Sequence, residues 1–201
     1  MTRIAIVIGS TRPGRRGELV ARWIKEKAEA HATALSGAAT YEIVDLADVE
    51  LPLLNEPLPP LFGQYQQEPT RRWAETVAGF DGFVVVTPEY NHGIPAVLKN
   101  AIDHLYAEWN NKAAGFVSYG VHGGVRAAEH LRQVFAEVKV PGVRSQVALG
   151  LFTDFRIEDP TETGVLEAGP HHDETVGELL DEVVAWSDAL APLRDRAAAA
   201  A

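Results

Sequence analysis

The sequence passes from a strand pattern to a helix pattern at residues 87–96, which read Thr87-Pro88-Glu89-Tyr90-Asn91-His92-Gly93-Ile94-Pro95-Ala96. An apolar run, Phe83–Val86, comes directly before them. Open α/β sheets bind ligands at such junctions, outside the carboxyl ends of their strands. A second junction lies near the start of the chain, where Ile4–Ile8 leads into Gly9-Ser10-Thr11-Arg12-Pro13-Gly14-Arg15-Arg16-Gly17-Glu18. Two loops of this kind predict one ligand site.

Short apolar runs alternate with segments of helical periodicity along the chain. The runs expected to form strands are Arg3–Ile8, Tyr41–Leu46, Phe83–Thr87, Gly115–Tyr119 and Val143–Leu149. Helical spacing of apolar residues begins near Leu19, Ile94, Ala127 and Val176, and a shorter helix is expected over Thr70–Ala78. This alternation predicts an α/β fold with a parallel sheet covered on both faces.

The length and composition fit one globular domain over residues 1–201, with 46% hydrophobic and 23% charged residues. The stretch 194–201, which ends in alanines, is expected to be a disordered or frayed tail or a passive extension of the last helix. Two connections, 52–69 and 150–172, are long for a compact domain. Each is interpreted as a lid, an oligomer contact or a plain surface excursion.

A formal net charge of −10 argues against nucleic acid or an anionic membrane as the main partner. No apolar stretch is long enough for a transmembrane helix, and the first residues enter a strand without a charged leader, so a cytoplasmic protein is expected. The chain has no cysteine, which excludes disulfides, thiolate nucleophiles and cysteine-held metals. Redox chemistry would therefore need an organic cofactor or a metal site without thiolates.

The first loop has the groups needed to hold a phosphate monoester. Ser10 and Thr11 can donate hydrogen bonds, Arg12 can form a bidentate contact, and free amides around Gly17 and Glu18 mark a helix start. The loop matches neither a Walker A motif nor G-x-G-x-x-G. The alternative is a solvated turn. Of the three arginines, Arg12 is favoured as the phosphate ligand, and surface charge only is the alternative for Arg15 or Arg16.

The second loop is expected to read a flat heterocycle with carbonyl groups, such as the pyrimidine edge of a flavin. Pro88 stiffens the turn, so that the amides of the following residues can be aimed at a ligand, together with the Asn91 side chain; these residues are Glu89, Tyr90, Asn91, His92 and Gly93. His92 is either an acid/base group or a turn residue that contacts the ligand through its backbone. Glu89 is either a reactive carboxylate or a structural acceptor.

A third junction, Ser118-Tyr119-Gly120-Val121-His122-Gly123-Gly124, is short on side chains and lets the backbone approach a ring closely.

Other residues carry weaker signals. Asp45 is interpreted as a strand-end cap, and the pair His171-His172 as solvated, so no metal site is expected. The absence of G-x-S-x-G argues against a hydrolase of that type.

Together these motifs resemble the NADPH-dependent FMN reductase family, a flavodoxin-like group that includes quinone, azo-dye and chromate reductases. The resemblance runs from Ile4 to about Leu149. It is carried by Gly9-Ser10-Thr11-Arg12, by Ser118-Tyr119-Gly120 with Gly123-Gly124, and by residues 87–91 followed by Pro95 and Leu98-Lys99-Asn100-Ala101-Ile102-Asp103. It implies a three-layer sandwich with a five-stranded sheet of order 2-1-3-4-5 and noncovalently bound FMN. It also implies a homodimer or a tetramer built from dimers.

By motif position the resemblance implies that Ser10, Arg12, Gly17 and Glu18 surround the FMN phosphate. Pro88, Glu89, Tyr90, Asn91 and Gly93 would line the isoalloxazine, with Ser118, Gly120 and Gly123 closing the site. Thr11, Arg16, His92 and Tyr119 complete the expected cofactor-binding set. Many relatives have serine or asparagine where this chain has Gly17, which leaves only a backbone contact there.

The implied function is an FMN-dependent oxidoreductase that takes hydride from NADPH or NADH and passes it to a quinone-like acceptor, another small acceptor or free flavin. No acid or base side chain is essential, because the flavin supplies the chemistry. One alternative is a non-enzymatic FMN electron carrier of the flavodoxin type, which the arginine in the first loop disfavours; another is an FMN-responsive sensor. Aromatic residues at Phe62, Tyr65, Tyr106 and Trp109 favour a homodimer, unless they cap the core of the chain itself.

Overall fold

The computed structural model describes residues 1–34 and 39–199. Five parallel strands form one sheet in the order β2-β1-β3-β4-β5; their bounds are β1 Thr2–Ile8, β2 Ala39–Asp45, β3 Gly82–Pro88, β4 Ala113–Gly120 and β5 Gly142–Gly150. The predicted sheet and its order are confirmed. Every predicted strand overlaps an observed one, although Leu46 belongs to the next helix, because Asp45 caps that helix through a hydrogen bond from the Ala47 amide.

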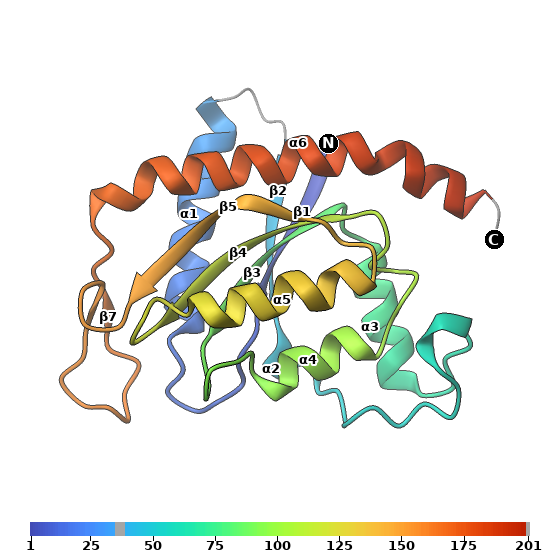
Figure 1. Cartoon of the computed structure of the whole chain (residues 1–201), viewed down its shortest axis with the longest axis horizontal. Coiled ribbons are helices and arrows are strands. Elements are labelled where there is room, and N and C mark those ends of the chain that lie inside the picture. Colours follow the sequence, from blue (N-terminus) through green and yellow to red (C-terminus); the bar gives the residue numbers. More distant parts are fainter. Residues whose placement is uncertain (35–38, 200–201) are drawn as a thin grey trace.

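Helices cover both faces of the sheet and make the structure three layers deep (Figure 1). One face packs against α1 (Gly17–Ala34) and α6 (Asp173–Ala198). The other packs against α3 (Glu68–Ala78), α4 (Ala96–Asp103) and α5 (Val125–Glu137). The remaining elements are short: α2 Leu46–Val49, η1 Pro60–Phe62, β6 Phe155–Arg156, β7 Val165–Leu166 and η2 Pro170–His172.

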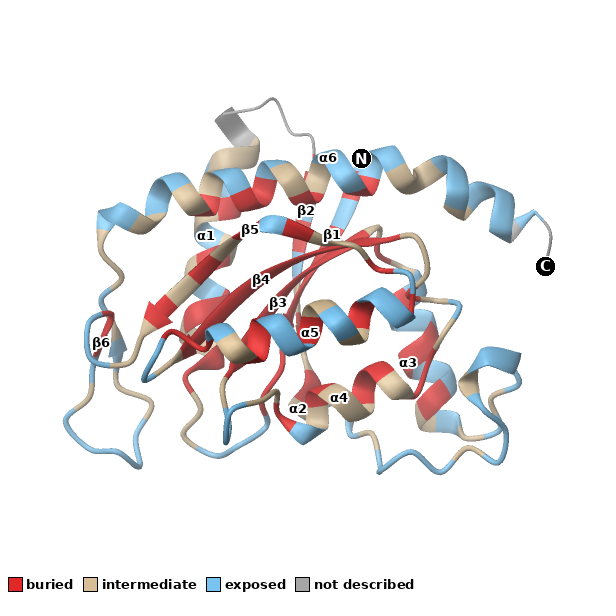
Figure 2. Ribbon diagram, viewed as in Figure 1, coloured by how far each residue is buried: buried red, intermediate tan, exposed pale blue. Residues whose placement is uncertain are grey.

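The strands read as nearly continuous apolar runs because the central ones are buried on both faces. Every residue of β3 is buried. Alternate residues serve opposite layers: Phe83 and Val85 pack toward α3, α4 and α5, whereas Val84 and Val86 pack toward α1 and α6. Figure 2 shows the resulting pattern, with buried strands between helices whose outer faces are exposed.

Both long connections are tied to the body of the protein. The segment 52–69 is held by Asn100, whose side chain donates to the Pro52 carbonyl (2.8 Å) and accepts from the Leu54 amide (2.9 Å). The segment 150–172 contains the antiparallel hairpin β6–β7, and the Glu167 amide donates to the Asp154 carbonyl at 2.8 Å. The second connection therefore has an ordered scaffold of its own.

The last helix continues to Ala198, so residues 194–198 extend that helix, which is one of the two expectations for this stretch. Arg194 fastens this end of α6 to the body of the protein. Its guanidinium donates to the carbonyls of Asn111 (3.0 Å) and Ser187 (2.9 Å) and to the Asp81 carboxylate (3.0 Å). Residues 200–201 lie outside the described part. No helix of the described residues combines the length and apolar character needed to cross a membrane.

Candidate functional site

Three loops meet at the carboxyl edge of the sheet. They follow β1, β3 and β4, which are neighbours in the sheet and run in the same direction. The first loop is therefore beside the second, and the second is beside the third (Figure 1). The structure thus brings together the three motifs that the sequence singled out, which are far apart along the chain.

The first loop is linked to the second by a side-chain hydrogen bond. Ser10 is buried, and its Oγ lies 2.7 Å from the Oη of Tyr90. Thr11 and Arg12 are exposed. The guanidinium of Arg12 donates only to the carbonyls of Pro13 (3.0 Å) and Gly14 (3.4 Å), so no carboxylate of the described residues neutralises it. Its charge remains available to an anion.

The loop leads into the amino end of α1. The first backbone bond of this helix runs from the Val20 amide to the Arg16 carbonyl (3.2 Å). The amides of residues 17–19 have no partner within the helix, as at every helix start. Gly17 fits closely, because a Cβ there would lie 2.9 Å from Ile8 Cγ2 and 3.3 Å from Tyr119 Oη. Only glycine allows the backbone at position 17 to lie this close to Ile8 and Tyr119 without displacing either side chain.

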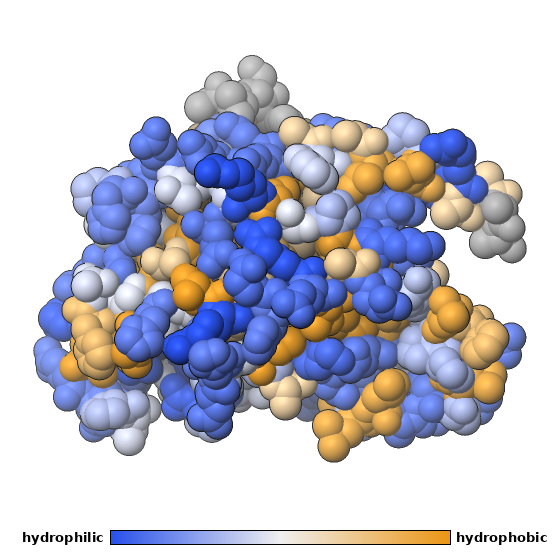
Figure 3. Space-filling view, viewed as in Figure 1, coloured by the Kyte–Doolittle hydropathy of each residue, from blue (hydrophilic) through white to orange (hydrophobic). Residues whose placement is uncertain are grey.

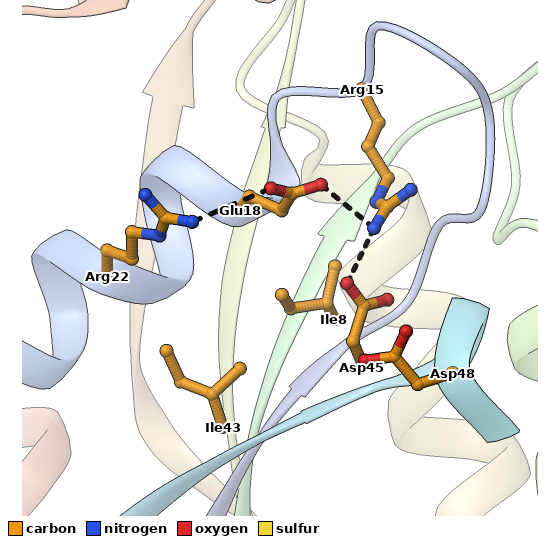
Figure 4. Close-up of a pocket in the computed structure, with 7 residues that line it drawn as sticks. All are labelled: Ile8, Arg15, Glu18, Arg22, Ile43, Asp45 and Asp48. Carbon is orange, nitrogen blue, oxygen red and sulfur yellow. Dashed lines mark hydrogen bonds and ion pairs between the residues drawn. The ribbon is translucent and has the colours of Figure 1, made fainter.

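Arg15 has its charge neutralised within the protein. Figure 4 shows its guanidinium between Glu18 and Asp45, at 2.9 Å and 2.5 Å, in a pocket of about 400 Å³. The Glu18 carboxylate lines this pocket and is neutralised there by Arg15. Asp45 also accepts from the Ala47 amide at 2.9 Å, which confirms its interpretation as a cap.

Arg16 is buried, so its interpretation as surface charge is wrong. One of its terminal nitrogens donates to the Glu162 carbonyl at 3.0 Å, in the loop between β6 and β7, and its Nε has no partner in the described part of the chain. Burial lowers the pKa of Arg16, and the neighbouring charge of Arg12 lowers it further. Two guanidinium groups in this loop therefore repel each other, and a bound anion would relieve that repulsion.

The second loop forms a tight turn that fixes which amides are free. Tyr90 and Gly93 exchange both backbone hydrogen bonds, at 3.0 and 3.1 Å. Asn91 and His92 stand between them with φ of 49° and 74°. Positive φ at both central residues is the geometry of a type I′ turn, which side chains other than glycine adopt at some energetic expense.

The expectation of successive free amides from Glu89 to Gly93 is wrong for three of the five residues. The Glu89 amide donates to the Tyr119 carbonyl (3.1 Å), and the amides of Tyr90 and Gly93 are used within the turn. Among the described residues, the amides of Asn91 and His92 have no acceptor. Both residues are exposed, so their amides are the donors that a ligand can use.

Glu89 is a structural acceptor, one of the two roles expected for it. Its side chain is only 8% exposed and pairs with the Arg126 guanidinium, while Oε2 accepts from the Arg126 amide at 3.2 Å. Burial alone would raise the pKa of Glu89, but the hydrogen bonds and the charge of Arg126 outweigh it and hold that pKa below its ordinary value. The carboxylate stays ionised at the amino end of α5.

The third loop is shaped by its own contacts. Ser118 is buried and donates from Oγ to the Gly123 carbonyl at 2.7 Å. Gly124 has φ of 68°, and a Cβ there would lie 2.8 Å from the backbone of Tyr119. A Cβ at Gly120 would make ordinary contacts, the nearest 3.5 Å from Gly124 N, whereas a Cβ at Gly123 would lie 3.0 Å from Ala148 Cβ. Pro88, which closes β3, is buried beside them.

The Tyr119 side chain does not line the third loop. It packs on the side of the sheet covered by α1 and α6, against Phe155, with ring centroids 6.0 Å apart. Its hydroxyl reaches the amino end of α1 near Gly17. Tyr119 therefore lies at the phosphate end of the expected site and not at the ring end.

A carboxylate that the sequence did not indicate, that of Asp154, lies beside the pair His171-His172. Asp154 Oδ1 lies 2.8 Å from His172 Nε2, and one ligand atom each of Asp154, His171 and His172 lie within 4.8 Å of one another. Asp154 is buried and also accepts from the Gly150 amide and the Thr153 hydroxyl, both at 2.8 Å. These bonds fasten the 150–172 connection to the end of β5. The interpretation of His172 as solvated is wrong.

A doubly wound 2-1-3-4-5 sheet with these loops at its carboxyl edge defines a flavodoxin-like protein. The model of one family, described as NADPH-dependent FMN reductase, matches residues 2–154. The chain belongs to this family. The predicted family and the predicted class of enzyme, an FMN-dependent NAD(P)H oxidoreductase, are confirmed.

Individual relatives agree with this assignment. The chain is 39% identical over 179 residues to an NAD(P)H-dependent FMN reductase of Schizosaccharomyces pombe, covering 88% of this chain and 84% of the relative. It is 31% identical over 198 residues to a quinone reductase of Escherichia coli, covering 92% and 94%. Among solved structures, the flavoenzyme FerB of Paracoccus denitrificans is similar in fold, with a TM-score of 0.68 and 22% identity over 94% of this chain and 98% of FerB.

Proposed function

We propose that this chain binds FMN across the three loops and uses it to pass hydride from NADPH or NADH to a quinone-like acceptor, another small acceptor or free flavin. The observation that carries the proposal is the convergence of a cationic loop, two free amides and a glycine-rich loop at one edge of the sheet. FMN, when bound, supplies the chemistry of accepting and donating hydride. The protein has to position the reactants and exclude competing reactions.

The phosphate end of the proposed site is the first loop. Ser10, Thr11 and Arg12 are the side-chain donors, and the amides of Gly17 and Glu18 add the positive end of the α1 dipole. The unpartnered Nε of Arg16 supports this placement, because a buried donor without an acceptor is a site that an anion can complete. The bond between Ser10 and Tyr90 joins this end to the ring end.

The ring end is the second loop, where the unpartnered amides of Asn91 and His92 would donate to carbonyl oxygens of the isoalloxazine. The strained turn holds both amides in place before the ligand arrives. Pro88, Tyr90 and Gly93 form the edge beside them, and Ser118, Gly120 and Gly123 form the opposite wall. Glu89 contributes indirectly, by fixing β3 to α5.

We propose that no side chain at this edge acts as an obligatory acid or base. Glu89 is kept ionised by Arg126, and His92 is exposed on the turn. Hydride transfer depends on geometry more than on proton transfer, which agrees with such a site. The quinone-like acceptor is proposed from the name of the quinone reductase relative, and the proposed location is the cytoplasm.

A direct test uses the purified protein and its absorbance. The protein should bind FMN and lose the yellow flavin absorbance when NADPH is added without oxygen, and a quinone should restore it. Arg12→Ala should lower FMN affinity by about 1.5–3 kcal/mol, the value of a hydrogen bond to a charged group. Tight FMN binding without reduction by NADPH or NADH would favour an electron carrier or a sensor instead.

We further propose that the active unit is a homodimer, with a tetramer as the larger alternative. Trp109 was expected to favour a homodimer, but it does not support one, because it is buried against Trp73, Phe83 and Phe135. The segment between α2 and α3 supports it better: exposed apolar residues gather there, at the lower right of Figure 3, namely Leu53, Leu54, Leu58, Leu61 and Phe62. Light scattering tests the proposal, since a mass near 21.8 kDa with full activity would refute it.

A further inference from the structure

One buried hydroxyl in the protein has no hydrogen-bond partner at the edge where the ligand is proposed to bind. Tyr119, the second-to-last residue of β4, is only 5% exposed, and its Oη has no partner among the described residues. Buried polar groups are nearly always satisfied, and an unpartnered hydroxyl is destabilising. Such a group in a native fold indicates an acceptor that arrives from outside the chain.

The surroundings of this hydroxyl indicate what that acceptor is. A Cβ at position 17 would lie 3.3 Å from Tyr119 Oη, which places the hydroxyl at the first residue of α1. The helix amides there are free, and the partnerless Nε of Arg16 belongs to the preceding residue. The nearby carboxylate of Glu18 is engaged by Arg15. Donors therefore converge on this point with no carboxylate to receive them.

The protonation state of Tyr119 suits a donor. Burial raises the pKa of the phenol above its ordinary value, and Tyr90 raises it further, against the opposing charges of Arg12 and Arg16. The hydroxyl keeps its proton at neutral pH. It can donate to an anion that has only acceptor atoms, and a phosphate monoester is such an anion.

We propose that the Tyr119 hydroxyl donates a hydrogen bond to the phosphate of FMN and takes the place of a side-chain donor at position 17. This rests on the proposed function. The same geometry explains the glycine: a serine at position 17 would bring its Cβ to 2.9 Å from Ile8 Cγ2 and crowd the hydroxyl of Tyr119. In this chain the proposed donor therefore comes from β4 and not from the side chain at the start of the helix.

The test compares FMN with riboflavin, which has the same ring system and no phosphate. Flavin is removed from wild type and Tyr119→Phe, and both flavins are titrated by fluorescence quenching. The variant should bind FMN about 10- to 100-fold more weakly, as for a lost hydrogen bond to a charged group, with riboflavin affinity unchanged. Tyr41→Phe is the matched control, because Tyr41 is also buried in the α1 and α6 layer but lies in β2; it should change neither affinity.

Stability of the flavin-free protein gives a second readout that a merely structural role would not reproduce. Tyr119→Phe removes an unsatisfied hydroxyl, so the urea midpoint of the flavin-free variant should equal or exceed that of wild type while FMN binding weakens. Equal losses of affinity for FMN and riboflavin, or no loss for either, would overturn the role of Tyr119. A wild type that binds FMN no better than riboflavin would instead refute the proposed phosphate site itself.

Discussion

The ion pair between Glu89 and Arg126 allows a stability prediction from the structure. Glu89 Oε1 contacts the guanidinium, and Oε2 accepts from the Arg126 amide in the first turn of α5. That helix begins after Gly124, which has no side chain to cap it, so Glu89, which follows β3, supplies a negative charge at the helix start instead. Because the Arg126 side chain is 38% exposed, the ion pair is expected to contribute to the free energy of unfolding as a surface pair does, up to about 1 kcal/mol.

A carboxylate at a helix start adds about 0.3–1 kcal/mol. Glu89→Gln should therefore lower the free energy of unfolding by about 0.5–2 kcal/mol at pH 7. The folded-state pKa of Glu89 is lowered, so this stabilisation is present above the unfolded pKa of about 4.3 and is lost as pH falls through the folded pKa. The difference between wild type and variant should shrink toward zero in acid.

Urea unfolding of the flavin-free protein, followed by tryptophan fluorescence from neutral to acid pH, measures this difference. Glu42→Gln is the control, because Glu42 pairs with Arg3 at 3.5 Å and both side chains are mostly exposed. It should change stability by less than about 0.5 kcal/mol. If Glu89→Gln matches this control at pH 7, or if its effect persists undiminished in acid, the capping role of Glu89 is wrong.

Four further outcomes are expected. Gly17→Ala should destabilise the protein by about 1–3 kcal/mol in urea, because the new Cβ would lie 2.9 Å from Ile8 Cγ2; full stability would mean that the site relaxes freely. The pKa of Asp154 is lowered, because hydrogen bonds outweigh the effect of burial, so Asp154→Asn should cost about 1–3 kcal/mol at pH 7 and progressively less below about pH 4; equal urea midpoints at pH 7 would contradict this. His92→Ala should keep anaerobic flavin reduction within about tenfold of wild type in stopped flow, whereas a lost acid or base typically costs about 10²–10⁴-fold. FMN affinity should fall as salt rises from about 50 to 500 mM, and titrations with Arg12→Ala should show a shallower slope, since screening weakens exposed charges; parallel slopes would place Arg12 outside the field of the phosphate.

The sheet could be predicted from the sequence because the signals that specify it are local. Runs such as Ile4–Ile8 and Phe83–Val86 are rich in β-branched residues and are flanked by loop residues, which is typical of strands buried on both faces. The loops at the carboxyl ends of those strands follow from the parallel arrangement. The prediction of the strand order had another source, because it came from the resemblance to a known family and not from local signals.

The site was less predictable because side-chain partners come from distant parts of the chain. The burial of Arg16 depends on a carbonyl at Glu162, and Glu89 is tied to Arg126, 37 residues away. No periodicity or spacing connects such pairs. The number of free amides in the second loop also depends on the type of turn, and the pattern of residues alone did not reveal that Tyr90 and Gly93 bond to each other.

The distribution of charge at the first loop shows how an acidic chain can accommodate an anion. With a net charge of −10, the protein as a whole repels phosphate and nicotinamide nucleotides. Arg15 offsets two nearby carboxylates, those of Glu18 and Asp45, and so removes negative charge from the loop. Within the described part of the chain, Arg12 and Arg16 then remain without acidic partners. One arginine neutralises the surroundings and the other two are left for the ligand, so the local field at the start of α1 is opposite in sign to the charge of the whole chain.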